Sequence, residues 1–263
     1  MFVKAILCRL RRAVNWHLST ICCAISFLTI VPMPRPHSES AIKMCSWLFP
    51  FVGLLIGALI ATVDSLLLLL MPESATSAIT VGMLAAITGG LHLDGLADLA
   101  DAIGSLKDRR GQLEVMRDAH IGALGAASVC IVLLLKYALI ASVNPPLRWV
   151  ALSLAPMLGR YCAALSMLLF PYARSEDGIA FRMREHRMEQ LIAATAYTVI
   201  AVHAAASYVG HISMWLCIVI TILISLRLTK RFGGLTGDCY GATVEICETA
   251  SLFAFAMLQK VFL

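Results

Sequence analysis

The sequence predicts an all-α protein, a polytopic integral membrane helix bundle that forms a single domain over residues 1–263. Hydrophobic residues make up 60% of the chain and charged residues 14%, whereas soluble domains are about half apolar and about a quarter charged. Apolar stretches of roughly the 20 residues needed to cross a bilayer also follow one another along the chain. Backbone polar groups cannot stay unpaired in lipid, so these stretches should be helices.

The apolar segments lie at about 14–31, 47–70, 76–91, 121–143, 147–170, 190–209, 212–228 and 241–262. Lys and Arg concentrate in the connectors 33–46, 92–120, 171–189 and 229–240. The other connectors hold none, apart from Arg148 at the edge of one. Because basic loops stay in the cytoplasm, this alternation predicts about seven spans from residue 47 onward. The first segment follows a basic N-terminus, so we expect it to be re-entrant or interfacial.

A cluster of aspartates directly follows the apolar segment 76–91. Asp94, Asp98 and Asp101 are spaced i, i+4 and i+7, which places them on one face of a helix. Carboxylates at membrane depth are unfavourable and usually functional, and Mg²⁺ is usually held by carboxylates, waters and phosphate oxygens. The pattern therefore favours a Mg²⁺ site over a solvated acidic helix start.

Asp118 precedes the next apolar segment, which begins near residue 121. A carboxylate at this position is typical of a helix N-cap. It would equally complete the metal site formed by the aspartate cluster. The sequence leaves both interpretations open.

A glycine-rich turn, residues 233–237, leads into the last apolar segment. Free backbone N–H groups at the start of a helix bind phosphate, although Gly-Gly and Thr-Gly-Asp are also ordinary turn sequences. Asp238 and Glu245 follow it at i, i+7, on one helix face. Arg160, inside an apolar run, and Arg174 are further candidates for binding phosphate. Carboxylates, a glycine turn and cations on one membrane face indicate phosphoryl transfer assisted by metal.

These motifs, in this order, resemble the adenosylcobinamide-GDP ribazoletransferase (cobalamin synthase) family. The matching stretches are FLTIVPMP (27–34), TGGLHLDGLADLADAIGS (88–105), EVMRDAHIGALG (114–125), APMLGR (155–160), PYAR (171–174) and GGLTGDCYGATVEICE (233–248). One position departs from the family pattern. Ala119-His120 stands where the family usually has Ser-Arg.

The resemblance implies an Mg²⁺-dependent enzyme of the bacterial inner membrane, acting late in cobalamin biosynthesis. It would transfer the adenosylcobinamide phosphate group to α-ribazole, or its 5′-phosphate, and release GMP. Its catalytic loops, about 92–120, 171–189 and 229–248, would share the cytoplasmic face, and no nucleic acid would be a partner.

The resemblance also implies roles for individual residues. The catalytic residues are His92, Asp94 and Asp98, with His92 or one carboxylate as general base. The metal ligands are Asp94, Asp98, Asp101, Asp118, Asp238 and Glu245. The substrate-binding residues are Arg117, His120, Arg160, Arg174, Gly234, Thr236 and Gly237.

Two alternatives remain. A CDP-alcohol-type membrane phosphotransferase also uses clustered aspartates, but Asp94-Gly95 lacks the Ala-Arg that its usual motif places next. A non-enzymatic cation-coupled transporter would place its carboxylates near the midplane of broken helices. The carboxylates here lie at the ends of apolar segments, next to basic loops.

Overall fold

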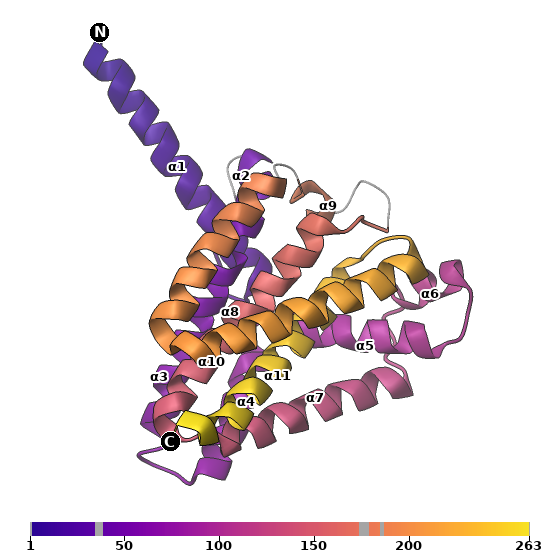
Figure 1. The fold of residues 1–263 in the computed structure, drawn as a ribbon. Helices are drawn as coiled ribbons and strands as arrows, with labels where there is room; N and C mark the ends of the chain where they lie inside the picture. Colours follow the sequence, from indigo (N-terminus) through magenta and orange to yellow (C-terminus); the bar gives the residue numbers. More distant parts are fainter. Residues whose placement is uncertain (1, 35–38, 174–178, 185–186, 263) are drawn as a thin grey trace.

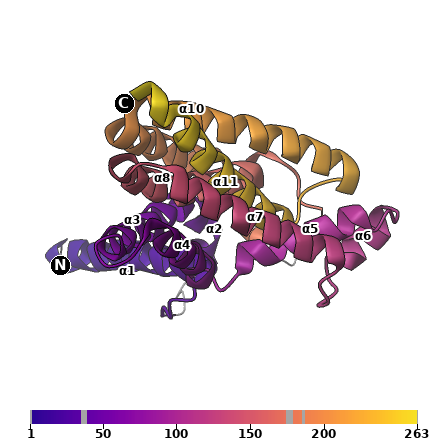
Figure 2. The same ribbon diagram turned by 90° about the horizontal axis from the view of Figure 1, so that it is seen from below.

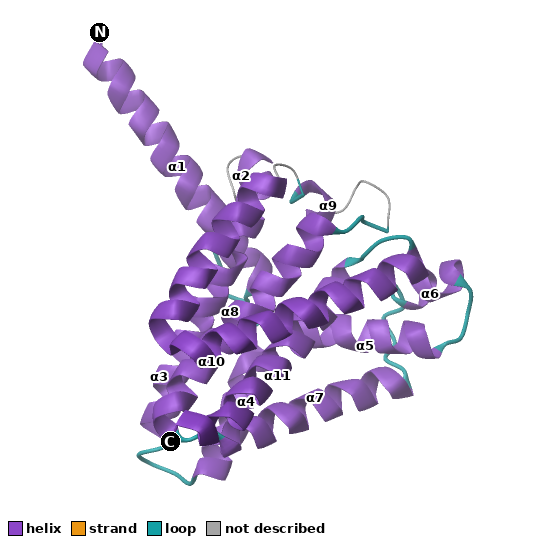
Figure 3. Cartoon of the chain, viewed as in Figure 1, coloured by secondary structure: helices purple, strands orange, loops and turns teal. Residues whose placement is uncertain are grey.

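The computed structural model describes residues 2–34, 39–173, 179–184 and 187–262, and over these residues it is helical, with no strand (Figure 3). The elements, in order, are α1 (Phe2–Leu28), α2 (Glu39–Met44), the 3₁₀ helix η1 (Cys45–Leu48), α3 (Phe49–Leu67), α4 (Glu73–Ile87), α5 (Leu91–Gly104), α6 (Arg109–Val115), α7 (Ala123–Ser142), α8 (Pro145–Leu169), α9 (Ile179–Arg182), α10 (Arg187–Phe232) and α11 (Gly237–Phe262) (Figure 1). The all-α prediction is confirmed.

Five helical stretches among the described residues are long and apolar enough to cross a membrane. They are Glu39–Leu67, α7, α8, the Tyr208–Phe232 part of α10 and the Gly237–Gln259 part of α11. A sixth span results if α4 and α5, which meet at 86°, count as one broken span. The structure is therefore a polytopic membrane bundle as predicted, with five or six spans where we expected about seven.

Helix α10 accounts for part of this difference. The sequence predicts two segments, 190–209 and 212–228, but the backbone stays helical from Arg187 to Phe232 and turns sharply within that helix (Figure 1). Unpaired backbone groups are unfavourable in lipid, so a bend that keeps the helical hydrogen bonds is preferred to an open turn.

Helix α1 projects away from the rest of the bundle (Figures 1 and 2). Its apolar part, Val14–Leu28, is shorter than a span. The C-terminal end of α1 is attached to the bundle. The ring of Phe27 stacks on that of Phe49, and Ile30 N donates to Ile87 O over 3.0 Å. That this segment is re-entrant or interfacial remains a prediction.

Helix α8 is the centre of the bundle, surrounded by α3, α10 and α11 (Figure 2). Helices α3 and α8 approach through Gly53 and Gly57, which lie four residues apart on one face of α3. A Cβ atom on Gly53 would lie 2.4 Å from Pro156 O, and one on Gly57 would lie 2.4 Å from Ser153 O. Small residues at this spacing let membrane helices pack backbone to backbone.

We expect Gly57→Val to destabilise the protein by about 3 kcal/mol or more, because the added side chain would collide with the backbone of α8. Thermal unfolding of the detergent-solubilised protein measures the effect. Gly82→Ala is the matched control, since a Cβ atom on Gly82 would meet nothing within 4 Å. Equal unfolding temperatures for the two variants would contradict the close α3–α8 packing.

Arg148 is buried, so it does not indicate which side of the membrane its connector occupies. Its Nε and Nη2 atoms donate to the two carboxylate oxygens of Asp64 over 2.8 and 2.6 Å. Thr80 Oγ1 donates to the same carboxylate over 2.6 Å. Arg148, which lies beside a connector without Lys or Arg, is thus neutralised by Asp64 inside the bundle.

Candidate active site at the crossing of α5 and α11

Helices α5 and α11 cross with almost no side chain between them. A Cβ atom on Gly95 would lie 2.9 Å from Asp238 O, and one on Gly241 would lie 3.3 Å from His92 Cα. This approach brings Asp94 and Asp238 to the wall of one cavity. The two residues belong to different motifs and are 144 positions apart in the sequence (238 − 94). The sequence placed the two clusters on one membrane face, and the structure brings one carboxylate of each together.

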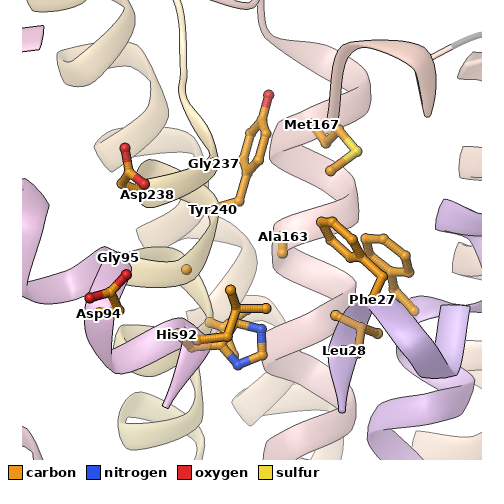
Figure 4. A pocket seen from close by; sticks show the side chains of 14 residues that line it. Phe27, Leu28, His92, Asp94, Gly95, Ala163, Met167, Gly237, Asp238 and Tyr240 are labelled. Carbon is orange, nitrogen blue, oxygen red and sulfur yellow. The ribbon is translucent and has the colours of Figure 1, made fainter. Parts of the chain in front are cut away.

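The cavity has a volume of ≈ 240 Å³ and reaches inward from this crossing. Asp94 and Asp238 stand at one side of it, and Phe27, Ala163 and Met167 stand at the other (Figure 4). A second, more open hollow of ≈ 680 Å³ lies beside it, and Asp94 lines both.

The three aspartates of α5 face different surroundings. Asp98 is half-buried and lines neither hollow. Both carboxylate oxygens of Asp101 accept backbone hydrogen bonds from the start of α7, from Gly122 N over 2.7 Å and from Gly125 N over 2.8 Å. Within the part of the chain that the structure describes, no three His, Cys, Asp or Glu side chains converge as a metal-binding group.

The capping role that the sequence left open for Asp118 therefore belongs to Asp101. Asp118 is exposed and accepts hydrogen bonds from His120, from its backbone N over 3.1 Å and its Nδ1 over 2.7 Å. These hydrogen bonds hold the pKa of Asp118 below its usual value. Arg117 is exposed in the same stretch. The metal-binding roles of Asp101 and Asp118 remain predictions.

Glu245 lies in a buried ion network behind the cavity. Lys136 Nζ of α7 is 2.7 Å from Glu245 Oε2 and 2.5 Å from Glu248 Oε2, and Glu248 also pairs with Arg160 of α8. Arg160 Nη2 lies 3.5 Å from Nδ1 of His92, which lines the cavity. Two cations thus balance two carboxylates in a region without solvent, as buried charges require.

Sequence reasoning missed Lys136 and left Glu248 out of the candidate site. A signal was available, because Lys136 is the one charged residue in the apolar run 121–143. A lone lysine in a span is unfavourable unless a carboxylate of another helix pairs with it. The run 241–262 offers the buried Glu245 and Glu248.

The glycine-rich turn is held by the PYAR motif. Leu235 N donates to Pro171 O over 2.8 Å, and Ala173 N donates to Leu235 O over 2.9 Å. Gly234 is needed at this contact, because a Cβ atom there would lie 2.6 Å from the carbonyl carbon of Tyr172. The next residue of the motif, Arg174, lies outside the described residues.

The end of the turn forms the start of α11. Thr236 is buried, and its Oγ1 lies 3.2 Å from Asp238 Oδ2 and 3.4 Å from Cys239 N. Gly237 is exposed at the first position of the helix. The other end of the turn contacts Arg109, an exposed residue that the sequence analysis did not select: a Cβ atom on Gly233 would lie 2.3 Å from Arg109 Nη2.

Comparisons with known proteins identify the family to which the chain belongs. Residues 20–256 match the family described as cobalamin-5-phosphate synthase. The chain is 34% identical over 235 residues to the adenosylcobinamide-GDP ribazoletransferase of Brevibacillus brevis, covering 87% of this chain and 94% of that protein. It is 36% identical over 233 residues to the protein of the same name from Roseiflexus sp., covering 87% and 86%. No solved structure matches.

The fold and these matches define a membrane-embedded transferase of the phosphotransferase kind, with a role in cobalamin biosynthesis. The chain belongs to the cobalamin-5-phosphate synthase family. The predicted family is confirmed.

Proposed function

We propose that this protein is an adenosylcobinamide-GDP ribazoletransferase. It transfers the adenosylcobinamide phosphate group to α-ribazole, or to its 5′-phosphate, and releases GMP. A ribose hydroxyl oxygen forms the new bond to the phosphorus on the cobinamide side. The bond from that phosphorus to the bridging oxygen breaks, GMP leaves, and a base accepts the hydroxyl proton. The observation that carries the proposal is the shared cavity of Asp94 and Asp238, which belong to two motifs of the family.

Asp94 and Asp238 are the residues that would hold Mg²⁺. Both supply hard oxygen donors from different helices to one cavity. Mg²⁺ commonly takes one or two carboxylates and completes its shell with waters and substrate phosphates, so two carboxylates suit it. The ion, when bound, would offset negative charge on the transferred group. Asp98 lies one helical turn from Asp94 and remains a candidate ligand.

The surroundings of His92 favour a carboxylate as general base. Arg160 can only donate hydrogen bonds, so His92 Nδ1 is the acceptor in their 3.5 Å contact and the ring proton lies on Nε2. In that form Nδ1 is occupied by Arg160 and Nε2 already carries a proton, so Asp94 or Asp238 takes the proton of the attacking hydroxyl.

The diphosphate of the donor would be held at the cytoplasmic face. Gly234, Thr236 and Gly237 offer the turn before α11, where a helix N-terminus favours anions. Arg117, His120 and Arg174 would add positive charge or hydrogen-bond donors. Arg160 is occupied by Glu248, so its contribution is to position Glu248 and His92 from behind the cavity.

The reaction is tested with purified protein, Mg²⁺ and both substrates. We expect adenosylcobalamin and GMP in equal amounts with α-ribazole, loss of both products on chelation, and recovery when Mg²⁺ is restored. Comparing kcat/KM for α-ribazole and its 5′-phosphate identifies the preferred acceptor. If folded protein releases no GMP, the enzymatic proposal fails and the transporter alternative returns.

We further propose that the protein lies in the bacterial inner membrane with this site on the cytoplasmic side. In a background without other reactive cysteines, Leu70→Cys should react with an impermeant maleimide in intact cells. Arg110→Cys, in a basic connector, should react only after permeabilisation. Both positions are exposed, so accessibility alone does not distinguish them. Labelling of Arg110→Cys in intact cells would overturn the proposed orientation.

A further inference from the structure

The apolar side of the small cavity contains two stacked aromatic rings. The rings of Phe27 and Phe49, both in the lining, stack with centroids 5.6 Å apart and planes at 12°. Ala163 and Met167, one turn apart on α8, add an apolar wall. Asp94 and Asp238 lie on the opposite side of the cavity from this wall (Figure 4). A ligand here would place an apolar ring at one end and polar groups at the other.

Asp94 stands between this cavity and the open hollow. Among the residues that the structure describes, it is the one with an ionisable side chain that lines both. The hollow is bordered by Thr88, Gly90, Ile121 and Val129, and is nearly three times as large, ≈ 680 against ≈ 240 Å³. Two ligands of different size can therefore approach the same carboxylate from different directions.

We infer that the small cavity binds the apolar base of the acceptor riboside, and that the cobinamide donor approaches Asp94 from the open hollow. This inference rests on the proposed function. A corrin with its amide side chains is far larger than a bicyclic base, so only the acceptor suits the enclosed space. With its dimethylbenzimidazole against Phe27, the riboside places its ribose toward the carboxylates, where its hydroxyl must react.

The same geometry predicts selectivity for the base. Apolar walls favour burial of a benzimidazole, which carries few hydrogen-bonding groups. A guanine would leave its amino and carbonyl groups without partners against Phe27 and Met167, which is unfavourable for buried polar groups. The apolar side of the cavity therefore favours the base of the acceptor over the guanine of the leaving GMP.

The test is a crossed pair of variants that fill one space each. Ala163→Leu fills the small cavity, so we expect the KM for α-ribazole to rise about tenfold or more while the Kd for adenosylcobinamide-GDP stays unchanged. Val129→Phe fills the open hollow and should weaken donor binding without changing the KM for α-ribazole. An Ala163→Leu variant that binds donor normally and keeps the wild-type KM for α-ribazole would overturn the inference.

Comparing acceptor ribosides that carry different bases on one variant gives a result that does not depend on how much of that variant folds. Met167→Ala enlarges the cavity, so kcat/KM for a riboside with a bulkier base should rise relative to that for α-ribazole. Unchanged relative values would contradict the assignment.

If wild-type protein makes no GMP, the proposed function has failed separately. Equilibrium dialysis of α-ribazole against wild type and Ala163→Leu then decides the subsite: binding weakened by the variant supports it, and equal or absent binding overturns it.

Discussion

Replacing Asp94 with asparagine is expected to lower turnover about 1,000-fold, because a neutral side chain holds Mg²⁺ poorly and the charge of the transition state then loses its stabilisation. The unfolding temperature should stay near that of wild type, since the substitution preserves shape. Single-turnover release of GMP across a range of Mg²⁺ concentrations measures the loss. Near-normal rates for Asp94→Asn at limiting Mg²⁺ would exclude Asp94 as a ligand.

Asp101→Asn is the matched control on the same helix. An asparagine turns an NH₂ group toward one of the two backbone N–H donors that Asp101 accepts. We therefore expect a loss of about 1 kcal/mol of stability with the Mg²⁺ dependence of the remaining activity unchanged. A selective loss of Mg²⁺ affinity in Asp101→Asn would instead support the predicted role of Asp101 as a metal ligand.

Lys136→Met is expected to destabilise the protein by about 3–5 kcal/mol, the usual result of leaving a buried charge unpaired. Without Lys136, two buried carboxylates face the single cation of Arg160. Chemical denaturation in detergent, or the yield of folded protein, reports the loss. The double variant Lys136→Met/Glu245→Gln has one cation and one carboxylate again, so it should recover more than half of the lost stability.

The double variant also decides the role of Glu245. If Glu245 serves only as the counterion of Lys136, the refolded double variant keeps the wild-type dependence on Mg²⁺. If Glu245 binds metal during turnover, the double variant is folded but needs much more Mg²⁺. If the double variant recovers no stability, the balance of charges in the network does not stabilise the folded protein.

The sequence was sufficient for the class of fold, because hydrophobicity averaged over about 20 residues reports membrane insertion directly. It was insufficient for the number of spans. Gly210 and His211 separate the predicted segments 190–209 and 212–228 like a turn, and only the structure shows that the helix continues through them. Local sequence does not reveal whether polar residues between two apolar segments form a solvent-exposed turn or a bend within one continuous helix.

The candidate site shows the same limit at the level of side chains. Helical spacing correctly put three aspartates on one face, but partners on other helices decide what each does. Asp101 accepts hydrogen bonds from the start of α7, whereas Asp94 lines one cavity with Asp238 because Gly95 and Gly241 let two distant helices approach closely. Such contacts depend on the whole arrangement of the bundle, which spacing within one segment cannot encode.

The ion network has a consequence for the order in which the protein matures. Lys136 and Arg160 enter the membrane with α7 and α8, but their carboxylate partners arrive only with α11, which follows them in the chain. Until then the nascent bundle carries two uncompensated cations, which are unfavourable within the membrane. Asp238 arrives with the same helix. Neutralisation of the interior and completion of the cavity wall therefore both depend on the insertion of α11, and a chain that stalls before α11 keeps two buried cations without their carboxylates.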